Sequence, residues 1–121
     1  MEIDVLKDKV IDLLDEMKAL DVQTFNVTGM TTVTDYMIVS SGSSSRHVRS
    51  IAARVLDELR EDGVRPLGSE GEQHGEWVLI DYGDVVLHVM RPETRDFYQL
   101  EKLWSPDVKE MLRLHREGAI E

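Results

Sequence analysis

The sequence predicts an α/β sandwich in which helices pack on a mixed sheet of four or five strands. Two observations indicate this class. Helical periodicity alternates with short β-like runs along the chain, in the order helix, two strands, helix, about three strands, helix. A strand–helix–strand crossover then makes at least one strand pair parallel, so the sheet has to be mixed.

The first half of the chain contains two amphipathic helices with two strands between them. Apolar residues spaced three and four apart predict a helix over about residues 3–20. Residues 23–28 are β-like, and residues 35–40 form a short apolar strand that we expect to be buried on both faces. A serine run at 41–45 ends this strand. The next helix has an apolar stripe from Val48 to Leu59 and stops at Gly63.

The second half begins with a predicted edge strand at 65–67, because Pro66 restricts it to an edge. A mobile loop at 68–75 and a β-hairpin follow. A helix over about 93–104 can pack Phe97, Leu100 and Leu103 on the sheet, which leaves Tyr98 and Glu101 on one flank. A last helix is expected at about 107–116. We therefore expect one domain over residues 1–105 and a helical tail over 106–121.

The hairpin of residues 76–91 is the most informative segment. If Gly83 and Asp84 form a two-residue turn, paired residues share a face and the two faces differ. One face is core material and comprises Val78, Ile80, Tyr82, Val85, Leu87 and Val89. The other face mixes an indole, a thioether, a carboxylate and an imidazole, and comprises Trp77, Leu79, Asp81, Val86, His88 and Met90. This mixture is typical of a surface that a partner covers.

Composition indicates the chemical character of the partner. The net charge is −10, and no lysine or arginine occurs from Pro66 to Met90. This charge favours a basic partner over sequence-specific binding to nucleic acid. Cysteine is absent, which excludes disulfides and thiolate metal sites and suits a reducing cytosol. The sequence shows no signal-peptide pattern and no apolar run of about 20 residues, so we expect a cytoplasmic protein without a membrane span.

Three candidate sites can be weighed against ordinary structural roles. Ser43, Ser44 and Arg46 stand at a strand-to-helix junction that can hold an anion, although the pattern favours an ordinary serine cap on a glycine turn. Asp81 and Asp84 are three residues apart across a turn, which does not favour a two-metal centre. The four histidines have no ligand spacing, so we predict no metal and no cofactor.

Three segments, in order, resemble the signatures of the ribosomal silencing factor family (RsfS, also called Iojap). They are TDYMIV at 34–39 with GSSSRHV at 42–48, EG at 70–71 with GEWVLIDYGDVVLHV at 75–89, and RDFYQLEKLW at 95–104. The resemblance covers about residues 3–105 and leaves the tail outside it.

The resemblance implies a fold similar to nucleotidyltransferases without their catalytic residues. It also implies a non-enzymatic translational repressor that binds ribosomal protein fourteen of the large subunit. Such a factor blocks joining of the small subunit by steric overlap and lowers translation when nutrients are scarce. Many family members dimerise when free, so a homodimer is possible here. On this basis we expect the partner to contact Trp77, Asp81, Asp84, His88, Met90, Tyr98 and Glu101.

Two alternatives stay open. One is an active metal-dependent nucleotidyltransferase that uses the Gly42-Ser43 turn. The other is a small-anion sensor at residues 43–46.

Overall fold

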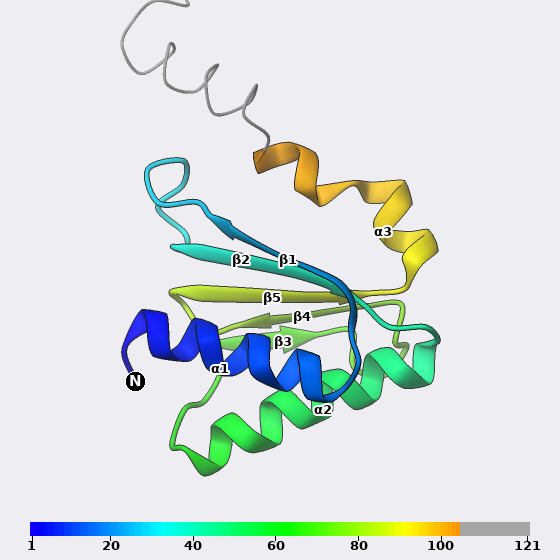
Figure 1. Cartoon of the computed structure of the whole chain (residues 1–121), viewed down its shortest axis with the longest axis horizontal. Helices are drawn as coiled ribbons and strands as arrows, with labels where there is room; N and C mark the ends of the chain where they lie inside the picture. Colours follow the sequence, from blue (N-terminus) through cyan, green and yellow to red (C-terminus); the bar gives the residue numbers. More distant parts are fainter. Residues whose placement is uncertain (105–121) are drawn as a thin grey trace, which may run out of the picture.

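The computed structural model describes residues 1–104, and its centre is a mixed sheet of five strands (Figure 1). The strands are β1 (Leu20–Asn26), β2 (Tyr36–Ser41), β3 (Gly68–Glu70), β4 (Trp77–Asp81) and β5 (Val85–Met90). Their order across the sheet is β1-β2-β5-β4-β3. Only β2 and β5 pair in parallel among these strands, and the other neighbours are antiparallel. The predicted α/β class and the mixed sheet are confirmed.

Two long helices, α1 (Ile3–Glu16) and α2 (Ser45–Glu61), lie on one face of the sheet (Figure 1). Their apolar stripes meet the inward side chains of β2, β4 and β5 in one core. The fully buried residues there include Val10, Leu14, Ile38, Ile51, Val55, Leu59, Ile80 and Leu87. Within residues 1–104, no helix has the length and apolar composition needed to cross a membrane.

The first helix is shorter than predicted. It ends at Glu16 because Lys18 takes a left-handed backbone conformation with φ of 57°, which reverses the chain. Leu20, which was expected on the helical stripe, is instead 44% exposed at the start of β1. The second helix follows the prediction more closely. Ser44 caps its N-terminus by accepting the His47 N–H, and Gly63 follows its last turn with φ of 79°.

The edge strand lies three residues later than predicted, at Gly68–Glu70 instead of 65–67. It pairs antiparallel with β4, so the expected loop at 68–75 is wrong for its first three residues. Pro66 lies just before the strand, and the first ladder contact is the Leu67 N–H bonded to the Asp81 carbonyl at 2.7 Å.

The hairpin register is confirmed. Val78 pairs with Val89 and Ile80 pairs with Leu87 across β4 and β5. Gly83 takes a positive φ of 87° in the turn, and the Tyr82 N–H donates to the Val85 carbonyl at 2.9 Å. The predicted core face is buried along its whole length.

The predicted single helix over 93–104 is wrong. The chain forms α3 (Pro92–Tyr98), a left-handed residue at Gln99 with φ of 50°, and a 3₁₀ helix, η1 (Leu100–Trp104). This break rotates the side chains away from the predicted stripe. Phe97 is 80% exposed and Leu103 is 55% exposed, although both were expected to pack on the sheet. The helix expected at 107–116 and the tail at 106–121 lie outside the described residues.

Candidate partner-binding face

The candidate site is the sheet face that α1 and α2 leave uncovered, which we call the open face. Alternation along each strand and the observed register assign its side chains, because paired residues share a face. Figure 1 shows α3 and η1 on this side of the sheet, away from the two long helices. The open face of the three central strands comprises Met37, Val39, Ser41, Trp77, Leu79, Asp81, Val86, His88 and Met90.

Trp77 is a half-buried aromatic residue at the start of β4. Its indole N–H donates to Nδ1 of His88 at 2.9 Å, and its ring centroid is 4.9 Å from that of Tyr98. The ring of Tyr98 lies 5.0 Å from that of Phe97. An aromatic row therefore runs from the sheet onto α3 and ends at an exposed phenylalanine that was not predicted as a site residue.

His88 is buried beneath this row, at 6% exposed. Because Nδ1 accepts the indole N–H, the neutral ring carries its proton on Nε2. Burial lowers the pKa of His88 to about 4, against a smaller opposing effect of the Glu101 charge. His88 is thus a neutral support for Trp77 at physiological pH.

The expectation that His88 and Met90 face solvent is wrong. Met90 is fully buried, and it pairs with Ser41 on one side and Trp77 on the other. Arg95 of α3 bonds to the Ser41 hydroxyl and Tyr98 packs on Trp77, so α3 lies over this end of the face. The predicted register assigned both side chains to the correct face, but it did not predict that α3 covers this end of the face.

The uncovered end of the open face contains an apolar groove of about 340 Å³. One wall is Trp104, whose indole N–H points at the sulfur of Met37 at 2.9 Å. The lining also includes Val33, which is 74% exposed. Residues that also line the groove are Thr31, Thr34, Leu79, Asp81, Val86 and His88. Sequence periodicity did not identify the groove, because the loop carrying Val33 and the 3₁₀ helix carrying Trp104 are distant in sequence.

The two aspartates of the hairpin occupy different environments. Asp81 is half-buried at the groove, and its Oδ1 accepts the Gly83 N–H at 2.8 Å, which supports the turn. Asp84 is exposed, and its backbone carbonyl accepts the N–H groups of Asp35 and Tyr36. Among residues 1–104, no three His, Asp or Glu side chains gather in a way that could hold a metal ion.

Glu101 contributes to the site through Arg95 rather than as a flank residue of a straight helix. Arg95 is only 7% exposed, and its Nε donates to the Glu101 carboxylate while Nη1 donates to the Ser41 hydroxyl at 3.1 Å. Its Nη2 lies 3.5 Å from Asp21 of β1. This buried guanidinium joins α3, η1 and the sheet, and no local sequence pattern indicated its burial.

At the strand-to-helix junction of residues 42–46, a serine serves as the N-terminal cap of α2. Ser44 is the helix cap, and the Ser43 N–H donates to Nδ1 of His47 at 2.8 Å. Nε2 of the same ring lies 2.8 Å from the Met17 carbonyl, which ties the junction to the end of α1. Arg46 is exposed. The N–H groups of Ser43 and His47 are thus bonded within the protein, and anion binding here stays a prediction.

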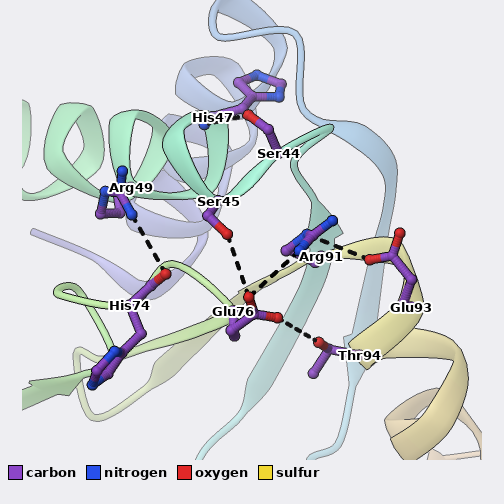
Figure 2. Close-up of polar contacts among 9 residues, drawn as sticks. All are labelled: Ser44, Ser45, His47, Arg49, His74, Glu76, Arg91, Glu93 and Thr94. Carbon is purple, nitrogen blue, oxygen red and sulfur yellow. Dashed lines mark hydrogen bonds and ion pairs between the residues drawn. The ribbon is translucent and has the colours of Figure 1, made fainter.

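A polar junction joins four elements beside the open face (Figure 2). The carboxylate of Glu76 is reached by the Ser45 hydroxyl at 3.4 Å, by Arg91 at 3.5 Å and by the Thr94 hydroxyl at 3.4 Å. Glu76 directly precedes β4, Ser45 begins α2, Arg91 directly follows β5, and Thr94 lies near the start of α3. These contacts link the start of α3, the helix that carries Tyr98, to the residue that precedes Trp77.

The structure is that of a small α/β protein in which one sheet face, free of the two long helices, carries aromatic and acidic side chains. The family model for "Ribosomal silencing factor during starvation" matches residues 2–119. This chain therefore belongs to the ribosomal silencing factor (RsfS) family.

Individual relatives support this family membership. A ribosomal silencing factor RsfS of Chromobacterium violaceum is 43% identical over 105 residues, which cover 87% of this chain and 86% of that protein. The RsfS of Bacillus subtilis is 38% identical over 75% of this chain and 77% of its own length. A crystal structure of a C. violaceum protein superposes with a TM-score of 0.83 at 43% identity, and covers 86% of this chain and 87% of its own. A mouse protein named for mitochondrial assembly of the ribosomal large subunit is 33% identical over 81% of this chain but only 44% of its own length.

Proposed function

We propose that this chain represses translation by binding ribosomal protein fourteen of the large subunit and blocking the small subunit sterically when nutrients are limited. Membership of the silencing factor family supports a regulatory role on the ribosome rather than an enzymatic one. The observation that carries the finer proposal is Trp77, which is half-buried and held by two neighbouring rings at the edge of an open face.

This face has the anatomy of a protein interface. Interfaces place aromatic anchors beside apolar pockets and surround them with a polar rim. Here Trp77 is the anchor, and the groove between Val33 and Trp104 accepts an apolar side chain of the partner. Asp81 and Asp84 provide negative charge at the rim, and a basic ribosomal protein is the complementary partner.

Repression by this route requires no chemistry from the protein. A small domain bound where two subunits meet excludes the second subunit by its volume. The affinity of the contact then decides what fraction of large subunits is kept from joining small subunits. Of the predicted contact residues, Tyr98 is the most exposed aromatic, at 54%, and it extends the anchor toward Phe97. Glu101 and the buried His88 and Met90 act beneath the contact surface.

The test is sedimentation with purified large ribosomal subunits. Trp77→Ala should weaken binding about 30-fold or more, which corresponds to about 2 kcal/mol for a central aromatic anchor. Val5→Ala is the matched control, because it trims an apolar side chain that is 52% exposed on α1, across the sheet from the open face. Thermal unfolding of each variant shows whether it is folded at the assay temperature. A folded Trp77→Ala protein that still sediments like the wild type would refute the assignment of the face.

Subunit joining tests the consequence of binding. Light scattering of mixed subunits should show less joining with the wild-type protein and normal joining with Trp77→Ala. If the wild type sediments with large subunits and joining is unaffected, the protein binds but does not repress by steric overlap.

A further inference from the structure

A second concave surface lies on the helical side of the molecule, across the sheet from the open face. It is a pocket of about 570 Å³ between α2 and the chain that leads into β3. Three arginines line it, namely Arg49, Arg60 and Arg65. The silencing function proposed above does not use this pocket.

The arginines of the described chain divide into two groups. Four have a carboxylate partner: Arg54, Arg60, Arg91 and Arg95. Three have none among residues 1–104: Arg46, Arg49 and Arg65. Arg49 bonds only to the His74 carbonyl at 3.4 Å (Figure 2). In a chain with 24 acidic and 14 basic residues, these three arginines keep a positive charge that no carboxylate of the described residues neutralises.

The three unpaired arginines and the ion-paired Arg60 lie along one side of the molecule and form what we call the arginine row. Arg46, Arg49, Ala53 and Arg60 recur at helical spacing on one side of α2, and Arg65 follows on the chain that closes the pocket. The row from Arg46 to Arg60 is about 21 Å long at 1.5 Å per residue. This length suits several phosphates of an extended backbone and exceeds what one small phosphorylated ligand would occupy.

We propose that this arginine row binds the phosphodiester backbone of RNA on the large subunit while the open face holds the ribosomal protein. The inference rests on the proposed function, because the first contact brings the row to the subunit. Arginine suits phosphate through its planar, bidentate donors. The pocket lining contains no aromatic ring on which a base could stack, so the contact reads the backbone and not the sequence.

The net charge of −10 weakens long-range attraction to RNA, so this contact has to be a local one. Asp57, one of two acids at the pocket, is paired with Arg60 at 2.5 Å. The second acid is Glu72. A weak contact is enough, because docking of the open face turns the second contact into an intramolecular one with a high effective concentration.

Site-specific photo-crosslinking to large subunits tests the occupant directly. A benzoylphenylalanine replacing Ala53, which is exposed in the pocket, should give adducts that ribonuclease removes. The same probe at Val33 should give adducts with protein. Adducts with protein only, or none, at position 53 together with protein adducts at position 33 would overturn the RNA contact and leave the proposed function intact. Failure of the wild type to sediment with subunits would overturn the proposed function itself.

Salt dependence gives an independent measure. The double variant Arg49→Gln with Arg65→Gln should lower the slope of log K against log salt by about 1.4 to 1.8, roughly 0.7 to 0.9 for each phosphate contact. Lys7→Gln with Lys18→Gln removes the same charge from α1 and its end, and should leave the slope near that of the wild type. Equal slopes for the two double variants would mean that only net charge matters and would refute the row as a site.

Discussion

The buried imidazole of His88 makes the stability of this protein depend on pH in a way that one substitution can isolate. His88 accepts the Trp77 indole N–H through Nδ1 and is 6% exposed. Asparagine places its side-chain oxygen close to the position of Nδ1, so His88→Asn keeps an acceptor for the indole and removes the titrating group. The pH dependence of stability that is left in the variant then comes from all the other titrating groups.

The magnitude follows from the pKa. Burial lowers the pKa of His88 to about 4 from 6.5, so the unfolded chain binds the proton more tightly than the native protein. The stability is fully present above pH 6.5 and is lost as pH falls toward 4. Between pH 7 and pH 5 the loss through His88 is about 2 kcal/mol, and below pH 4 it approaches about 3 kcal/mol, at about 1.4 kcal/mol per pKa unit.

Urea unfolding at pH 7 and pH 5 measures this difference. Carboxylates also titrate in the window, but they do so in both proteins, so the double difference between wild type and His88→Asn reports His88 alone. We expect the wild type to lose about 2 kcal/mol more than the variant. Equal losses in the two proteins would show that His88 is solvated or already charged, and would refute its role as a neutral support for Trp77.

Three further predictions concern the elements around the face. Glu101→Ala should lower the free energy of unfolding in urea by about 3 kcal/mol, because it leaves a guanidinium that is 7% exposed without its main partner. Arg95→Met should lower it by less. If Arg95→Met lowers it by more, the pair is not buried in solution. Gly71→Ala should destabilise by at least about 2 kcal/mol more than Gly63→Ala, judged by thermal unfolding. Both glycines have positive φ, but a Cβ at Gly71 would lie 1.9 Å from the Trp77 carbonyl oxygen, whereas none at Gly63 meets an atom within 4 Å; equal costs would place the steric conflict in doubt. Raising salt should slow association with large subunits in stopped-flow measurements, since rim charges steer the encounter. A rate that does not change with salt would remove the electrostatic part of the proposal.

Local sequence patterns predicted much of the fold. Spacings of three and four located α1 and α2, and the Gly83-Asp84 turn fixed the register of β4 and β5. These features succeed because hydrophobic periodicity and turn chemistry act over a few residues. The same register correctly assigned each hairpin residue to a face, including Trp77.

Sequence patterns failed where distant segments cover one another. The periodicity of residues 93–104 fits one helix, but Gln99 adopts a left-handed conformation and the chain turns. The ion pair between Arg95 and Glu101, six residues apart, accompanies this turn, and its partners Ser41 and Asp21 lie far away in sequence. Nothing local encodes such a buried charge, so the burial of the residues beneath α3 was missed.

The covered end of the open face shows how the half-buried side chain of Trp77 is held in one orientation. A free tryptophan on a surface samples several rotamers, and fixing one side chain on binding costs about 0.5 to 1.5 kcal/mol. In this protein the Trp77 indole is held before binding, by its bond to a buried imidazole and by the ring of Tyr98. The Glu76 junction in turn holds α3, which carries Tyr98. Under the proposed function, the buried residues lower the entropic cost of contact at Trp77, because they hold its side chain before a partner binds.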